Sequence, residues 1–147
     1  MNKILIFGLP GAGKTYLAER LQYEIDTAWY NADEVRKMAD DWDFTDEGRS
    51  RQANRMKTFA DFEKSNGRNV ICDFVCPFES AREHFEADIT IWLNTIEEGR
   101  FEDTNKVFQN PIPEEVDFVI TKDTWWEENH VNSWIDKIKS KLKDKII

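Results

Sequence analysis

The sequence of 147 residues is poor in cysteine and histidine, with two of each. Cys72 and Cys76 lie four positions apart and the histidines are isolated, so neither a disulfide framework nor a zinc site can be built. We interpret both cysteines as buried small hydrophobes beside a strand. No apolar run approaches the roughly 20 residues of a membrane span. Met1 runs directly into a strand-like segment, which predicts no leader peptide, no membrane attachment and a cytoplasmic location.

Positive charge is also scarce, because the formal net charge is -9. This balance argues against a broad nucleic-acid surface. A local cationic pocket can still attract small anions, and residues 48–57 contain four cations and no acid. The composition, with 40% hydrophobic and 33% charged residues, is typical of a soluble globular protein, and the length suits a single domain over residues 1–147.

Short apolar segments alternate with helical patterns along the chain. Lys3 to Phe7 is nearly continuously apolar, which is typical of a strand buried on both faces of a parallel sheet. Further strands are expected at 27–30, 69–75, 89–93 and 116–120, and helices at 14–25, 32–39, 46–65, from 77, and from a capping box Thr124-x-x-Glu127. The alternation predicts an α/β, three-layer fold with a five-stranded parallel sheet covered by helices on both faces.

The strongest motif is Gly8-Leu9-Pro10-Gly11-Ala12-Gly13-Lys14-Thr15, a full match to G-x-x-x-x-G-K-[ST] between a strand and a helix. Its glycines let backbone N–H groups surround a β-phosphate, and the following helix adds its positive dipole end. The Lys14 ammonium can reach the β- and γ-oxygens, and the Thr15 hydroxyl can bind Mg²⁺. We therefore predict a P-loop phosphotransferase that binds ATP and Mg²⁺ through Gly8, Gly11, Ala12, Gly13, Lys14 and Thr15.

A phosphate loop alone leaves kinases, GTPases and motor ATPases open. Thr121-Lys122-Asp123 does not match the N-K-x-D motif of GTPases, and a motor ATPase would need a longer chain and an acidic pair after a hydrophobic strand. Asp73 ends such a strand but is followed by Phe74. It could hold the water shell of Mg²⁺ or only cap the turn. The size, the helix-rich middle and a lid at 94–113 favour a small-molecule kinase.

From Asn31 onward, the residues resemble the adenylylsulfate kinase family, which phosphorylates the 3′-hydroxyl of adenosine 5′-phosphosulfate. The family's D-G-D-N-V-R stretch appears as Asn31-Ala32-Asp33-Glu34-Val35-Arg36, and its G-F-S-x-x-D-R stretch as Asp43-Phe44-Thr45-Asp46-Glu47-Gly48-Arg49. Its F-I-S-P-F-R stretch appears as Phe74-Val75-Cys76-Pro77-Phe78-Glu79, and its D-P-K-G-L-Y lid stretch as Asp103-Thr104-Asn105-Lys106-Val107-Phe108. The chain departs from the pattern where Asn31 replaces an acid, Gly48 an aspartate and Glu79 an arginine, and where the lid lacks the Lys-Gly pair.

The resemblance implies a role for each matched residue. Asp33 would orient the acceptor hydroxyl and accept its proton, as the second catalytic residue beside Lys14. Arg36 and Arg49 would hold the phosphosulfate group with their guanidinium forks, and Phe44 would stack on the acceptor's adenine. Backbone groups at 75–77 would contact the acceptor. The full acceptor set is Asp33, Arg36, Phe44, Arg49, Val75, Cys76, Pro77 and Lys106, with Arg100 as a second lid candidate; the metal set is Thr15 and Asp73.

Together, the motif and the resemblance predict an ATP-dependent kinase for adenosine 5′-phosphosulfate, acting in sulfate assimilation by direct in-line transfer. The expected partners are small nucleotides, without nucleic acid or membrane, and the sequence leaves a homodimer open. Two alternatives remain. One is a kinase for another small hydroxyl acceptor, such as a nucleoside, a sugar or a modified nucleotide. The other is a nucleotide-binding regulator without turnover, which the lid departures suggest.

Overall fold

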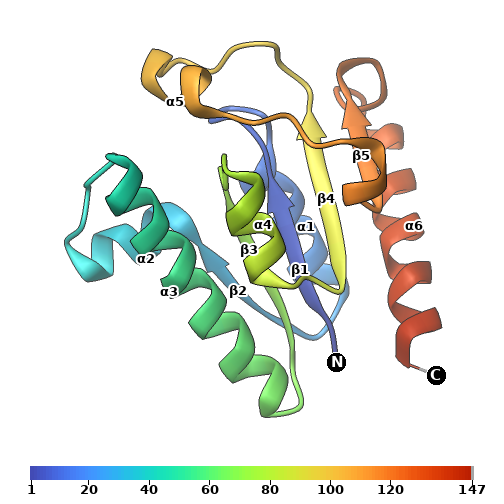
Figure 1. The fold of residues 1–147 in the computed structure, drawn as a ribbon. Helices are drawn as coiled ribbons and strands as arrows, with labels where there is room; N and C mark the ends of the chain where they lie inside the picture. The colour runs from blue at the N-terminus through green and yellow to red at the C-terminus, as the bar shows by residue number, and fades with distance from the viewer. Residues whose placement is uncertain (147) are drawn as a thin grey trace.

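The computed structural model describes the backbone of residues 1–146 and the side chains of residues 1–142. All strand pairs are parallel, and the order across the sheet is β2-β3-β1-β4-β5 (Figure 1). This arrangement confirms the predicted fold class. The strands are β1 (Lys3–Phe7), β2 (Thr27–Asn31), β3 (Asn69–Phe74), β4 (Ile89–Asn94) and β5 (Phe118–Thr121).

Helices connect successive strands and follow the last one. The α-helices are α1 (Lys14–Glu24), α2 (Ala32–Ala39), α3 (Asp46–Ser65), α4 (Glu79–Phe85), α5 (Glu102–Val107) and α6 (Glu128–Ile146), and two short 3₁₀ helices are η1 (Pro113–Glu115) and η2 (Lys122–Thr124). No helix within residues 1–146 is both long and apolar enough to cross a membrane.

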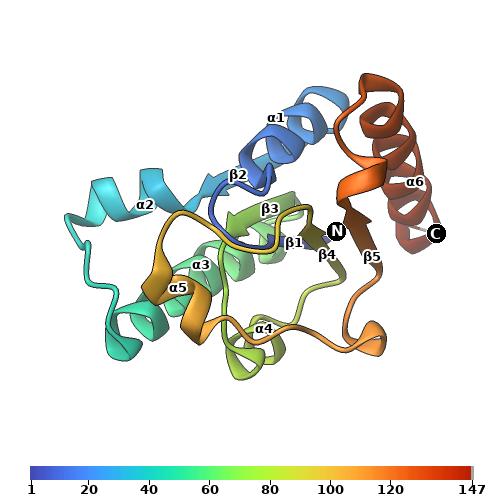
Figure 2. The ribbon, with the colours of Figure 1, turned by 90° about the horizontal axis from the view of Figure 1, so that it is seen from above.

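Side chains of β1 alternate between the two faces of the sheet, as the period of a strand requires. Ile4 and Ile6 pack in one core with residues of α1 and α6, whereas Leu5 and Phe7 pack in a second core with residues of α3 and α4. All four side chains are fully buried. Figure 2, seen from above, shows the sheet between these two helical layers. Burial on both faces explains why this strand is continuously apolar in sequence.

The predicted capping box at the last helix is wrong. The Thr124 hydroxyl lies in η2 and donates to the Thr121 carbonyl at 3.1 Å, and α6 begins only at Glu128. The Thr124 hydroxyl therefore bonds within the turn after β5 and is not the predicted cap of the last helix.

The carboxyl ends of the parallel strands meet at one edge of the sheet, shown at the top of Figure 1. The loop between β1 and α1 starts there, and α5 lies above it, on the side of α3. The segment between β4 and β5, where a lid at 94–113 is predicted, contains α5. In open α/β sheets, this edge is where ligands bind.

Candidate active site

The phosphate loop forms a compact turn between β1 and α1. The Leu9 carbonyl accepts hydrogen bonds from the Ala12 N–H at 3.1 Å and from the Lys14 ammonium at 2.9 Å. Gly11 and Gly13 have φ angles of 89° and 107°, which L-residues with side chains rarely adopt. No side chain caps α1, so the N–H groups of its first turn are available to an anion. Gly8 connects this turn to β1.

Two residues that the sequence did not indicate hold the loop in place. Thr95, buried directly after β4, donates from its hydroxyl to the Ala12 carbonyl at 2.7 Å. Trp125, after η2, lies against Gly13, where an added Cβ would meet ring atoms at 2.7–2.9 Å. The glycine at position 13 is therefore required both by its backbone angle and by the indole ring beside it.

Lys14 is largely buried, with 9% of its surface exposed. Burial lowers the pKa of its ammonium from 10.5 to about 8, and the nearby charges of Asp73 and Asp33 oppose this shift. The lysine therefore lies at the loop in an environment that penalises its charge until an anion compensates it. A bound phosphate would supply that compensation.

The predicted metal residues meet at the end of β3. The Thr15 hydroxyl lies 3.4 Å from Asp73 Oδ1, and the Asn31 amide N–H₂ donates to both residues, at 3.1 Å to Thr15 and 3.2 Å to Asp73. The Trp29 indole also donates to the Asp73 carboxylate, a contact that the sequence did not indicate.

This arrangement fits a divalent cation. Asp73 is 2% exposed, and burial raises the pKa of its carboxyl, while hydrogen bonds from Trp29 and Asn31 lower it. The burial cost shows that the donors compensate the negative charge only in part, and a cation would complete the compensation. One hydroxyl and one carboxylate suit Mg²⁺, which retains waters and phosphate ligands in nucleotide sites. Among the described residues, no group of three His, Cys, Asp or Glu side chains gathers into a metal site.

Asp33 lies in the first turn of α2 with an exposed side chain. The helix is capped by Asn31 instead, whose side-chain oxygen accepts from the Glu34 N–H at 3.1 Å. The Asp33 charge lies close enough to Lys14 to raise its pKa. The carboxylate is thus free to contact a substrate at the end of the phosphate loop.

Arg36 and Arg49, thirteen positions apart, converge on Phe44. Their guanidinium carbons lie 4.3 Å and 5.5 Å from the centre of its ring, within cation–π range. Both arginines are more than nine-tenths buried, and the phenyl ring is half exposed. Burial lowers the pKa of each guanidinium. The structure therefore brings together the three residues that were predicted to bind the acceptor's anion and base.

Comparison with known proteins identifies the family of this chain. The sequence model of the family described as adenylylsulphate kinase matches residues 2–99, more than half of the chain. The chain belongs to the adenylylsulphate kinase family. A curated relative, the probable adenylyl-sulfate kinase of Aeropyrum pernix, is 35% identical over 88 residues, which is 54% of this chain and 46% of the relative. The match therefore spans about half the length of that relative.

Solved structures of small-molecule kinases share the fold. The Mycobacterium tuberculosis APS kinase CysC, in complex with AMPPNP and APS, aligns with a TM-score of 0.75 at 15% identity, covering 97% of each chain. A gluconokinase from Sinorhizobium meliloti aligns with a TM-score of 0.70 at 12% identity, covering 98% of this chain and 97% of its own. At these identities, the likeness shows the architecture alone, and it agrees with the fold predicted for an adenylylsulphate kinase.

The stretch after β3 that was predicted to contact the acceptor forms hydrogen bonds within the protein. The Cys76 carbonyl accepts from Arg82 Nη1 at 2.9 Å, and the Pro77 carbonyl accepts from the Gln109 N–H at 2.8 Å. Cys76 is 1% exposed, and burial raises the pKa of its thiol to about 12. Val75 is half-buried. Contacts of residues 75–77 with the acceptor stay a prediction.

The two lid candidates have exposed side chains. Lys106, on α5, lies 3.6 Å from Glu102 Oε1, and Arg100 lies over the ring of Phe101 at 5.3 Å. Both line one hollow of about 400 Å³. Together with Glu98, Gly99, Glu102 and Asn105, they make up its wall. The hollow is a feature of the lid itself, and the role of Lys106 toward the acceptor stays a prediction.

Proposed function

We propose that this chain is an ATP-dependent kinase that transfers the γ-phosphoryl group to the 3′-hydroxyl of adenosine 5′-phosphosulfate. The observation that supports this acceptor is the convergence of Arg36 and Arg49 on the half-exposed ring of Phe44. Two buried guanidinium groups attract a multiply charged anion, and an exposed ring offers a surface to a base. A strongly acidic protein needs such a local cationic site for an anionic substrate.

In the proposed reaction, the acceptor oxygen forms a bond to the γ-phosphorus while the bond from phosphorus to the β,γ-bridging oxygen breaks. Asp33 holds the acceptor hydroxyl and takes its proton, and ADP leaves. Lys14 stabilises the negative charge on the transferred group and on the leaving oxygen. Thr15 and Asp73 would hold Mg²⁺, which would supply positive charge to the phosphates of ATP. No covalent intermediate with the protein is required.

The assay that tests this proposal measures ADP formation against a panel of hydroxyl acceptors, with the phosphorylated position determined by NMR. Adenosine 5′-phosphosulfate should give the highest kcat/KM, and its product should carry the new phosphate on the 3′-oxygen. ADP formation at background level with this acceptor, together with turnover of a sugar or nucleoside, would replace the acceptor and retain the kinase.

A different small hydroxyl acceptor is the second candidate, and one observation favours it. Several donors of the two arginines are already used by the protein, since Arg36 Nη1 donates to the Asp41 carbonyl at 2.8 Å and Arg49 Nε to the Phe44 carbonyl at 2.9 Å. Fewer free donors suit an acceptor with less negative charge. A regulator without turnover would instead bind ATP and give no ADP with any acceptor.

The proposal includes the location, the pathway and the partners that were predicted from the sequence. The kinase would act on free nucleotides in the cytoplasm, in sulfate assimilation, with no nucleic acid or membrane as partner. A homodimer remains part of this expectation and is measured directly by sedimentation of the purified chain.

A further inference from the structure

The loop between α2 and α3 (residues 40–45) folds back onto the first turn of α3 at Gly48. A Cβ added at Gly48 would lie 2.2 Å from the carbonyl oxygen of Asp43 and 2.5 Å from its Cγ. Real side chains do not approach other atoms so closely. The Asp43 residue therefore occupies the space that any side chain at position 48 would need.

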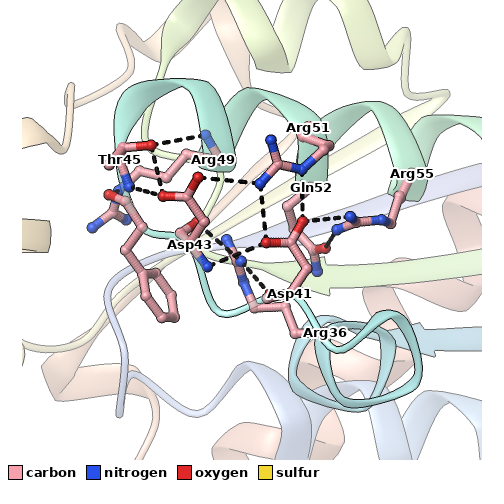
Figure 3. Close-up of polar contacts among 10 residues, drawn as sticks. Arg36, Asp41, Asp43, Thr45, Arg49, Arg51, Gln52 and Arg55 are labelled. Carbon is pink, nitrogen blue, oxygen red and sulfur yellow. Dashed lines mark hydrogen bonds and ion pairs between the residues drawn. The ribbon is translucent and has the colours of Figure 1, made fainter.

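The Asp43 carboxylate uses this position to bind the start of α3 (Figure 3). Its Oδ1 accepts from the Thr45 N–H at 2.9 Å and from the Thr45 hydroxyl at 2.6 Å, and its Oδ2 accepts from Arg51 Nη2 at 3.1 Å. The Thr45 oxygen in turn caps α3 by accepting from the Gly48 N–H at 3.2 Å. These hydrogen bonds, first those from Thr45, lower the pKa of the Asp43 carboxyl.

Asp41 fastens the other end of the same loop. Its carboxylate accepts from Arg51 Nε at 2.7 Å and Nη2 at 3.0 Å, and it also pairs with Arg55 (Figure 3). These two arginines therefore anchor the loop and neutralise its acids.

The fastened loop orients the residues proposed to bind the acceptor. Arg36 Nη1 donates to the carbonyls of Asp41 and Asp43, at 2.8 Å and 3.2 Å. Arg49 Nε donates to the Phe44 carbonyl at 2.9 Å. Both guanidinium groups are thus held by main-chain oxygens of residues 41–44. A shift of this loop would displace both arginines and the ring between them.

Positions 43 and 48 also exchange residue types relative to the stretch G-F-S-x-x-D-R quoted above. The pattern has glycine first and aspartate sixth, whereas this chain has Asp43 and Gly48. The Cγ of Asp43 lies 2.5 Å from the place of a Cβ at position 48, so the two positions share one space. The carbonyl oxygen of residue 43 lies closer still, at 2.2 Å, so a side chain at position 48 also requires this main chain to move.

We propose that Asp43, seated in the space left by Gly48, is a positioning residue of the acceptor site that acts through Arg36 and Phe44. An aspartate at position 48 could replace it only if the main chain of residue 43 moved aside, which glycine at position 43 would ease. The kinetic test of this inference rests on the proposed function, because it uses adenosine 5′-phosphosulfate as the acceptor. A second test, by amide hydrogen exchange, needs no acceptor.

The kinetic test is a double-mutant cycle of Asp43→Gly and Gly48→Asp. Asp43→Gly removes the carboxylate, and Gly48→Asp alone forces two residues into one space. Each single variant should raise the KM for adenosine 5′-phosphosulfate by roughly tenfold, within the coupling range of contacting residues. The KM for ATP should change little. The double variant should lose less than the two single losses combined, because glycine at position 43 removes the carboxylate and frees the main chain, whereas additive effects of the two changes would overturn the proposal.

Two further variants keep the result interpretable. Gly48→Ala adds only a Cβ, which must displace Asp43, so it should raise the acceptor KM and lower thermal stability without any change of charge. Asp40→Gly is the matched control, since Asp40 is an exposed acid of the same loop with a φ of 50°, which glycine adopts freely. It should leave both KM values unchanged.

Amide hydrogen exchange separates this inference from the proposed function. The Thr45 and Gly48 N–H groups, which bond to Asp43 and Thr45, should exchange faster in each single variant and regain part of their protection in the double variant. If that pattern holds but the wild-type protein does not phosphorylate adenosine 5′-phosphosulfate, the proposed acceptor is wrong and the positioning stands. If the wild-type protein is active and exchange and KM do not change in the variants, the positioning is wrong.

Discussion

Arg49 donates a hydrogen bond from Nη2 to Oγ1 of Thr104 at 3.0 Å, and this bond joins helix α3 to helix α5. It is buried, and the two residues are 55 positions apart in the chain. The same arginine contacts the ring of Phe44. A residue of the proposed acceptor site therefore also holds the lid segment.

Thr104→Val should release α5 from α3 while keeping the size and the buried environment of the side chain. We expect the KM for the acceptor to rise several-fold and the KM for ATP to change less, because Arg49 loses a partner on the acceptor side. Thr58→Val, on the exposed part of α3, is the control, since its hydroxyl bonds to the Asn54 carbonyl of its own helix. Equal kinetics of both variants would show that the bond does not position the lid.

Asp33→Asn should lower kcat by about 100-fold or more, the usual loss when a general base is removed. ATP affinity should stay within error, because the proposed partner of this carboxylate is the acceptor hydroxyl. Glu34→Gln changes the neighbouring exposed acid in the same turn of α2 and should leave kcat unchanged. A loss of ATP affinity as large as the loss of kcat would assign Asp33 to the metal or to the loop instead.

Arg36→Lys keeps the positive charge but loses the planar fork that bonds to residues 41 and 43. The acceptor KM should rise, and its dependence on salt should persist, because the charge remains. Arg36→Ala should raise the KM further and weaken the salt dependence. Lys37→Ala removes an exposed cation of the same helix and serves as the control for net charge. Unchanged acceptor kinetics in both Arg36 variants would remove the phosphosulfate assignment.

Much of this architecture follows from local sequence. The alternation of apolar runs and amphipathic segments located all five strands, and the bounds of α3 were predicted as observed, because Thr45 caps its start and Asn66-Gly67 ends it. The phosphate loop was located because its function requires specific residue types at fixed spacing.

The supporting contacts were not predictable in the same way. Trp29, Thr95, Thr104 and Trp125 act through tertiary contacts with residues 44 to 112 positions away in sequence, and their residue types are common in ordinary cores. For Thr95, the sequence signal was its position directly after β4, at the edge of the sheet where ligands bind in such folds.

The predicted capping box failed because the Thr124 hydroxyl bonds within its own turn. Local side-chain bonds of this kind compete with helix caps and depend on the backbone path.

Trp29→Phe should weaken the predicted metal site, because the Asp73 carboxylate loses the hydrogen bond that it accepts from the indole N–H. Without this donor, the pKa of Asp73 should rise further, since burial already raises it. The readout independent of activity is the carboxyl carbon of Asp73, titrated by NMR with and without Mg²⁺. Trp134→Phe is the matched control. It likewise loses an indole hydrogen bond, here one donated to the Thr124 carbonyl, far from β3. An unchanged Asp73 titration would mean that the indole does not contribute and that Asn31 and Thr15 hold the carboxylate.

The last prediction concerns pH and Lys14, whose pKa is lowered by burial from 10.5 to about 8. In the free protein, the ammonium begins to lose its proton as the pH rises through about 8. The charges of bound phosphates favour the ammonium and raise its pKa in the complex. Above pH 8, ATP binding must therefore take up a proton, and the affinity should fall with rising pH by up to about tenfold per unit. Below that value, this residue should contribute no pH dependence.

Isothermal titration calorimetry at pH 7.5 and pH 9, each in two buffers of different ionisation enthalpy, measures this proton uptake directly. The wild-type protein should take up about two-thirds of a proton more per ATP at the higher pH, as a group with a pKa of about 8 requires. Lys14→Ala should lose this difference, retain the fold by circular dichroism, and lose phosphoryl transfer by roughly 100-fold or more, as expected when a charge that stabilises the transition state is removed. The same proton uptake in wild type and variant would assign the titration to another group. Near wild-type turnover of the variant would mean that this loop is not the catalytic ATP site.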